Sequence, residues 1–177
     1  MVGIATAKSR RLQRLILAAL FAVMIFISKT ILPTPLDKML IVVQALFLGL
    51  GSITMWPFGA TIVSAISGLL TSAWRAPFAP FTLGFSVLYG LLVDTFLLLF
   101  KVKTDGALPM KRFVTAITLA TAVTGMASYY TTVHVLSLLP RNIALEVSIM
   151  VIGILNGIVG GYFAGVLWSK AVRHLVS

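Results

Sequence analysis

Six long apolar segments, separated by short links that hold most of the charges, constrain what this chain can fold into. The mean hydropathy is +1.07, and 59% of the 177 residues are hydrophobic. A hydrocarbon core about 30 Å thick takes roughly 20 helical residues to cross, and a soluble domain of this size could not bury so much apolar surface. We therefore predict an all-α integral membrane protein, a single domain over residues 1–177. The six predicted transmembrane helices lie near residues 15–34, 38–55, 57–73, 79–100, 113–139 and 143–169.

The basic residues predict how these spans are oriented. With the N-terminus in the cytoplasm, ten of the 14 Lys and Arg residues fall on the inner side. This excess follows the positive-inside rule, which an odd number of spans would break. We expect both termini to be cytoplasmic, and the net charge of +10 to contact the lipid bilayer and its anionic headgroups instead of nucleic acid. The inner bases are Lys8, Arg10, Arg11, Arg14, Lys101, Lys103, Lys111, Arg112, Lys170 and Arg173, and the outer ones are Lys29, Lys38, Arg75 and Arg141.

The link between the second and third spans is the weakest boundary. Residues 52–58 carry no charge, so the turn depends on Pro57 and the neighbouring glycines, with Trp56 as an interfacial anchor. A re-entrant hairpin is the alternative to two full crossings. At the N-terminus, the basic stretch 8–14 precedes an apolar run of about 20 residues without a small-x-small cleavage site, which indicates a first membrane anchor and not a removable signal.

The sequence lacks the usual motifs for catalysis and metal binding. It has no cysteine, which excludes disulfides, thiolate chemistry and cysteine metal sites. It also has no phosphate-binding glycine loop, so any energy from ATP must come from another chain. His134 and His174 are expected on opposite sides of the membrane, and no general acid and base can be placed together. We expect neither an enzyme nor a bound cofactor or metal ion.

Small residues recur at four-residue spacing in two of the spans. In lipid, glycine allows helix backbones to approach closely, and packing drives helix association. We interpret a glycine stripe in the sixth span as a helix-packing surface, against a neighbour in the same bundle or against another subunit. Ala18 and Ala22 form a shorter pair of this type in the first span. The stripe consists of Gly153, Gly157, Gly161 and Gly165.

Polar and ionisable side chains gather in the outer halves of the spans. Such groups are costly inside a membrane and are therefore candidate functional residues. Together they could line a cavity open to the outside, where rings stack on a solute and polar groups orient it. For each residue alone, the alternative is an aromatic belt, a cation that reaches the surface or a packed histidine. The candidate substrate-binding residues are Lys29, Trp74, Arg75, Thr82, Tyr130, His134, Glu146 and Asn156.

Asp94 is the unusual residue of the inner half. It lies about 21 Å down the fourth span from its outer end, near the inner interface. An ion pair with Lys101 or another inner base is one interpretation. A role in coupling to a cytoplasmic partner is the other.

The layout of the whole chain resembles the substrate-binding S components of energy-coupling-factor (ECF) vitamin transporters. Basic residues precede the alanine-rich first span, a proline-containing outer loop follows at 32–35, and Pro77-Phe78-Ala79-Pro80-Phe81-Thr82-Leu83-Gly84 enters a helix that bears Gly90. The resemblance implies a multi-pass protein of the cell membrane that captures a small water-soluble vitamin or related micronutrient from outside. It also implies ATP-driven uptake together with a transmembrane T subunit and two ATPase subunits.

The resemblance also assigns roles to residues. The outer polar cluster would bind the solute, and the face of Ala18 and Ala22 would contact the coupling helices of the T subunit. The cobalt and nickel branch has a metal-binding histidine close to the N-terminus, whereas this chain begins Met1-Val2-Gly3, so we expect no metal cargo. The four outer bases suggest an anionic or carbonyl-rich solute.

A structural scaffold is the main alternative function. The segment Gly90-Leu91-Leu92-Val93-Asp94 resembles part of the bacterial cell-shape protein MreD, a small six-span protein that organises cell-wall machinery and carries no cargo. The outer aromatic and polar residues favour a transporter, whereas Asp94 fits both interpretations. Other transporters or channels are a further possibility.

Overall fold

The chain folds into a bundle of helices. The structure, a computed structural model, describes residues 2–31, 40–74, 76–102, 108–135, 137 and 142–172, without the side chains of 2–11, 78 and 171–172. Every element in this part of the chain is helical, which confirms the predicted all-α class. The long helices are α1 (Val2–Ile31), α2 (Ile41–Thr54), α3 (Gly59–Trp74), α4 (Ala79–Leu99), α5 (Met110–Tyr130) and α6 (Ile143–Leu167). The short turns are the 3-10 turn η2 (Ala76–Phe78) and the π-helical turns η3 (Thr131–Val135) and η4 (Trp168–Val172).

Four of the described helical segments are long and apolar enough to cross a membrane. The helices α2 and α3 are apolar but shorter, with 14 and 16 residues. They rise about 21 and 24 Å, which is less than the hydrocarbon core of about 30 Å. The structure thus gives a helix in each of the six predicted spans, and membrane-spanning length in four. The four long segments are Leu12–Ile31, Ala79–Leu99, Met110–Val135 and Ile143–Lys170.

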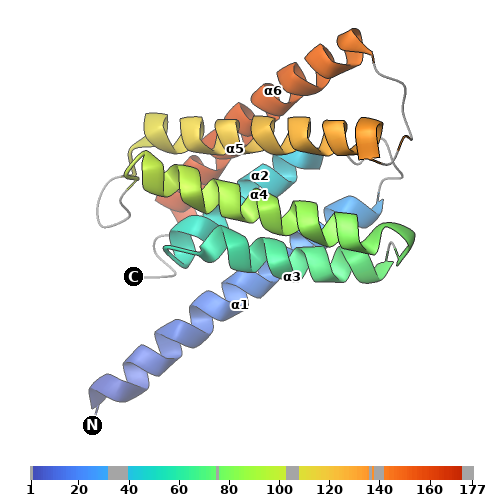
Figure 1. The fold of residues 1–177 in the computed structure, drawn as a ribbon. Coiled ribbons are helices and arrows are strands. Elements are labelled where there is room, and N and C mark those ends of the chain that lie inside the picture. The colour runs from blue at the N-terminus through green and yellow to red at the C-terminus, as the bar shows by residue number, and fades with distance from the viewer. Residues whose placement is uncertain are drawn as a thin grey trace.

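Helix α2 lies at the centre of the bundle. It contacts each of the other long helices, which follow one another around it in the order α1, α3, α4, α5 and α6 (Figure 1). Its second half, from Leu48 to Thr54, is buried at every residue. A helix shorter than the hydrocarbon core can occupy this position because its neighbours cover this half of it.

The ends of the helices define two ends of the bundle (Figure 1). One end holds the start of α1, the turn between α2 and α3, the end of α4, the start of α5 and the end of α6. We call it the basic end, because the exposed bases Arg14, Lys101, Lys111, Arg112 and Lys170 lie on these segments. The opposite end holds the last turn of α1 with Lys29, and we call it the polar end.

Helix α1 extends beyond the other helices at the basic end (Figure 1). Leu12, Leu15 and Ile16 are exposed, and burial begins at Ala18. From there the buried positions recur every three or four residues, which places them on one face of the helix, packed against α2 and α3. This face consists of Ala18, Phe21, Ala22, Ile25 and Ser28.

The glycine stripe of α6 packs against α5 of the same chain. A Cβ atom on Gly157 would lie 2.5 Å from the Cα atom of Thr118, and one on Gly161 would lie 3.3 Å from the Cα atom of Val114. The obstacles are backbone atoms, which cannot turn away. Gly160 faces the other neighbour, because its Cβ atom would lie 2.7 Å from that of Ala45 on α2. Glycine on two sides of α6 therefore allows this helix to fit between α5 and α2.

Candidate functional site

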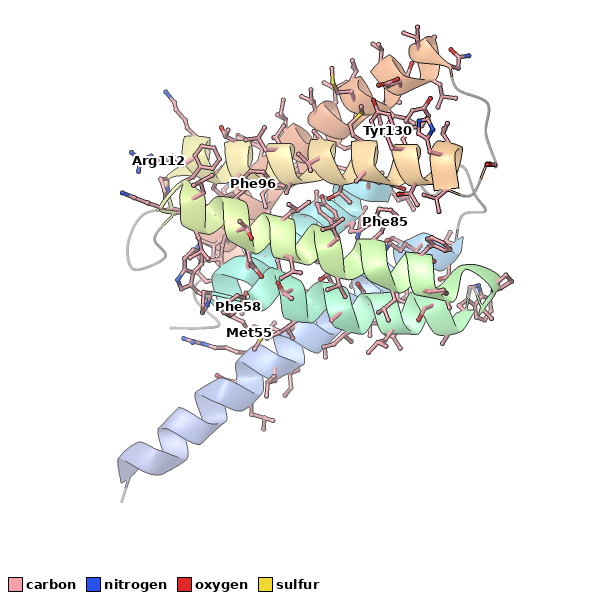
Figure 2. All side chains as sticks on the ribbon, in the orientation of Figure 1. Met55, Phe58, Phe85, Phe96, Arg112 and Tyr130 are labelled. Atoms are coloured by element: carbon pink, nitrogen blue, oxygen red, sulfur yellow. The ribbon has the colours of Figure 1, made fainter. Side chains whose placement is uncertain are left out.

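Three of the predicted site residues meet at the polar end, where α5 and α6 lie side by side. The hydroxyl of Tyr130 donates a hydrogen bond to Oε1 of Glu146. The imidazole of His134 stacks on the Tyr130 ring, with the ring centroids 5.9 Å apart and the planes 13° apart. Tyr130, labelled in Figure 2, is 40% exposed. This group therefore forms a polar surface between two helices and is not enclosed.

Tyr129, next to this group, fixes the start of α6. Its buried ring places the hydroxyl 3.2 Å from the carbonyl oxygen of Asn142, to which it donates a hydrogen bond. The side chain of Asn142 caps α6 by accepting a hydrogen bond from the backbone N–H of Ala144 at 2.9 Å. Tyr129 thus anchors the start of α6, the helix that carries Glu146.

Lys29 points into the bundle. Its ammonium lies 3.4 Å from the hydroxyl oxygen of Ser86, a buried residue on α4, and donates a hydrogen bond to it. Ser86 lies about 10 Å along α4 from Ala79, the first residue of that helix. The half-buried side chain of Lys29 therefore reaches toward the interior of the polar half.

Asn156 places an amide deep in the bundle. Its Nδ2 atom is buried and makes no hydrogen bond with any described residue. Gly160, one turn further along α6, faces α2, so Asn156 lies on the same side of the helix. Buried polar atoms normally have a partner, and an orphaned donor is a candidate contact for a ligand.

Two further predicted site residues, Trp74 and Thr82, make none of these contacts. Trp74, the last residue of α3, is 70% exposed, and Thr82 is half-buried near the start of α4. Arg75 lies outside the described residues. The candidates thus occupy three separate places. Tyr130, His134 and Glu146 lie on the α5–α6 surface, Lys29 lies at the α1–α4 contact, and Asn156 lies on the side of α6 that faces α2. Within the described part of the chain, the structure gives no group of three His, Asp or Glu side chains that could hold a metal ion.

Asp94 caps the start of α3. Its carboxylate accepts hydrogen bonds from the backbone N–H of Thr61 at 2.8 Å, from the hydroxyl of Thr61 at 2.7 Å and from the backbone N–H of Ala60 at 3.3 Å. The first N–H groups of a helix have no partner within it, and its N-terminus attracts negative charge. Among the described residues, the ion pair with a base that we had considered is not formed. Asp94 therefore has a structural partner, which nothing in the sequence pattern points to.

A second buried polar contact joins α4 to α5. The hydroxyl oxygens of Tyr89 and Thr121 lie 2.6 Å apart. Thr121 already donates to the carbonyl oxygen of Ile117, so Tyr89 is the donor in this pair. Many other Ser and Thr hydroxyls, such as those of Ser52 and Thr71, bond the carbonyl of the preceding turn in their own helix. These groups are satisfied locally and are not candidates for binding a solute.

Ala18 and Ala22, predicted as a partner-binding pair, are buried in the bundle. Neither side chain has any exposed surface, whereas Ala19 between them is exposed. Their small size allows α1 to approach α2 and α3 closely. In this conformation a partner subunit could reach Ala18 and Ala22 only after α1 had moved.

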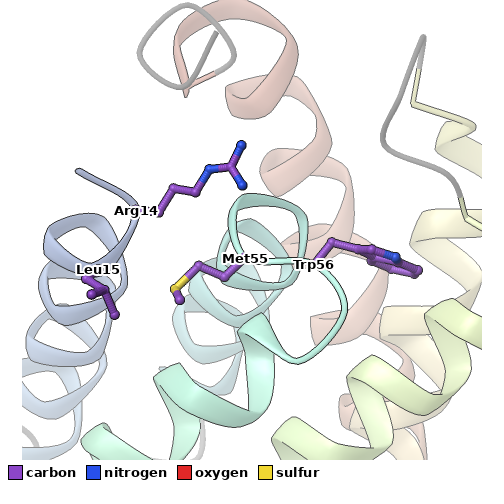
Figure 3. A pocket seen from close by; sticks show the side chains of 4 residues that line it. All are labelled: Arg14, Leu15, Met55 and Trp56. Carbon is purple, nitrogen blue, oxygen red and sulfur yellow. The ribbon is translucent and has the colours of Figure 1, made fainter. Parts of the chain in front are cut away.

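A cavity that the sequence did not indicate lies at the basic end. It has a volume of about 260 Å³ and opens between α1 and the turn that follows α2 (Figure 3). Arg14 and Leu15 line it from α1, and Met55 and Trp56 line it from the turn.

Comparison of the chain with protein-family models, with curated proteins and with solved structures finds no match. The functional argument therefore depends on the geometry of the described residues.

Proposed function

We propose that the chain is a multi-pass membrane protein with its basic end in the cytoplasm, and that it captures a small water-soluble solute at its polar end. The observation that carries the proposal is the inward direction of Lys29, whose ammonium reaches Ser86 inside the polar half. An ionisable side chain among membrane helices is by default a candidate functional residue. Capture from outside for uptake, as by an ECF S component, is a function that such a residue can serve.

The donors in the polar half indicate the chemistry of the solute. Lys29 offers an ammonium, and Asn156 offers a buried N–H group that has no partner among the described residues. Both groups donate hydrogen bonds, so carboxylate and carbonyl oxygens are the complementary groups on a solute. Vitamins and related micronutrients with such groups are the class that we propose.

ATP-driven uptake would require partner chains, because the sequence has no phosphate-binding glycine loop. We propose a T subunit and two ATPase subunits, the set that the ECF resemblance implies. Docking through Ala18 and Ala22 would need a movement of α1, because both are buried. The part of α1 that extends beyond the bundle, with Leu12 and Ile16 exposed, offers a surface that is accessible without such a movement.

The orientation can be tested with topology reporters. A reporter fused after Ser177, and one inserted in the link at 103–107, should both read cytoplasmic. A reporter in the link at 136–141 should read external, because α5 and α6 run in opposite directions. The contrasting result, an external reading after Ser177, would reverse or remove the proposed topology.

Solute capture can be tested with the protein purified in mild detergent. Denaturation should release a small compound in stoichiometric amount, detected by mass spectrometry against an unrelated membrane protein. Asn156→Leu should lose this compound, since a buried hydrogen bond to the solute contributes about 1–3 kcal/mol. The empty variant should be at least as stable as the wild type, because it no longer buries an unpaired amide.

The matched control is Ile158→Leu, an exposed apolar position on the same helix. It should retain the compound. An empty wild-type protein after growth in rich medium would contradict solute capture, and equal retention by Asn156→Leu would remove Asn156 from the site.

A membrane scaffold of the MreD type is the second candidate. The observation that favours it is the place of the cavity, at the basic end, where a solute arriving at the polar end would not enter. A scaffold predicts no released compound and stable association with other membrane proteins.

A further inference from the structure

The lining of the cavity at the basic end combines apolar side chains with the guanidinium of Arg14. Leu15 and the thioether of Met55 face each other across it, and the guanidinium of Arg14 lies at its rim (Figure 3). Trp56 completes the lining from the turn after α2. The cavity is open between α1 and this turn.

The guanidinium of Arg14 has no acidic partner among the described residues. The whole sequence has four acidic residues. Of the two that the structure describes, Asp94 is buried in the cap of α3, and Glu146 lies at the polar end with Tyr130. Arg14 is exposed, and the other charged side chains that the structure describes at this end, Lys101 and Arg112 among them, are exposed bases. An anion is therefore the ligand that this end of the molecule attracts.

The depth of Arg14 fits the headgroup region of a bilayer. Helix α1 rises about 26 Å between Arg14 and Ile31, at about 1.5 Å per residue. This length is close to the hydrocarbon core of about 30 Å, so the guanidinium falls at the interface. Trp56 lies at the same end of the bundle, and tryptophan is enriched at the interfaces of membrane proteins.

We propose that this cavity binds an anionic phospholipid. The phosphate of the headgroup accepts hydrogen bonds from the guanidinium of Arg14, and one acyl chain lies along Leu15 and Met55. The proposal requires that the chain lies in a membrane, but it does not require that it carries a solute. Such a lipid would join α1 to the α2–α3 turn at the point where α1 leaves the bundle.

An anionic lipid accounts for the lining better than a soluble phosphate compound does. A soluble ligand would gain little from Leu15 and Met55, whereas an acyl chain is stabilised by each CH₂ group that it buries. The excess of bases at this end concentrates anionic lipids nearby, and basic cavities between helices on the cytoplasmic side are typical sites for their headgroups.

The test is native mass spectrometry of the full chain after exchange into lipid-free detergent. Dioleoyl phosphatidylglycerol and dioleoyl phosphatidylcholine, which share their acyl chains, are titrated separately. The wild type should bind one phosphatidylglycerol more tightly than phosphatidylcholine. Arg14→Gln should weaken the binding of that first phosphatidylglycerol about five- to tenfold. It should weaken the binding of phosphatidylcholine less, because the choline group offsets the charge of the phosphate. Arg14 is exposed, so this substitution should leave the unfolding temperature unchanged.

Two controls separate the cavity from the general charge of the basic end. Arg112→Gln removes an exposed base at the same end outside the cavity and should bind like the wild type. Met55→Trp fills the cavity and should displace the first lipid while Arg14 remains. The proposal would be overturned if Arg14→Gln and Arg112→Gln weakened the binding of phosphatidylglycerol equally, or if the wild type showed no preference between the two lipids. Displacement by millimolar inorganic phosphate would also overturn it, because it would assign the site to a soluble phosphate compound.

Discussion

Gly157→Ala should destabilise the folded protein by about 1–3 kcal/mol, and Gly157→Leu should prevent folding. The added Cβ atom would lie 2.5 Å from the Cα atom of Thr118, so α5 and α6 would have to separate. In a membrane this separation removes the close packing that holds two helices together. The measurement is the unfolding midpoint in a single detergent, by heat or by SDS titration, together with the yield of monodisperse protein.

The matched control is the same substitution on α4. Gly84 is exposed, and nothing lies within 4 Å of a Cβ atom added there. Gly84→Ala should therefore leave the unfolding midpoint unchanged or raise it slightly, because alanine favours the helix more than glycine does. If both alanine variants had the same midpoint, the close contact between α6 and Thr118 would be wrong.

The helices themselves could be predicted because length and apolarity are local properties. Each predicted span contains a helix, and the links between α2 and α3 and between α4 and α5 fall where Pro57 and the basic stretch after Lys101 interrupt the apolar runs. The membrane-spanning length of α2 and α3 could not be judged in this way. The second half of α2 is covered by its neighbours, and a local stretch of sequence does not reveal these contacts with distant segments.

The inward-facing residues were harder to predict, for a physical reason. In a membrane protein both the interior and the lipid-facing surface are apolar, so the hydrophobic pattern does not separate them. Ala18 and Ala22 illustrate this. Their spacing indicated a packing surface, but the sequence did not show that the partner is the same bundle. The arrangement of the candidate site could not be predicted for the same reason. Tyr130, Lys29 and Asn156 make separate contacts and do not line one cavity.

Asp94 shows most clearly why long-range contacts cannot be predicted from a local pattern, since its hydrogen-bond partners lie 33 and 34 positions away in the sequence. Asp94→Ala should destabilise the protein by about 2–4 kcal/mol, because the backbone N–H groups of Ala60 and Thr61 would remain buried without an acceptor. Asp94→Asn keeps one acceptor oxygen and should cost about half as much. The measurement is the unfolding midpoint in detergent for both variants.

A double-mutant cycle connects this loss to the cap itself. Thr61→Val removes only the hydroxyl donor, which lies 2.7 Å from the carboxylate, and should cost about 1 kcal/mol. The double variant with Asp94→Ala should lose less than the sum of the single losses, because the hydroxyl has no acceptor once the carboxylate is gone. A coupling role predicts the opposite pattern: Asp94→Ala would fold with an unchanged midpoint and lose only its association with a cytoplasmic partner. The two roles of Asp94 are thus separated by stability alone, before any cargo or partner is known.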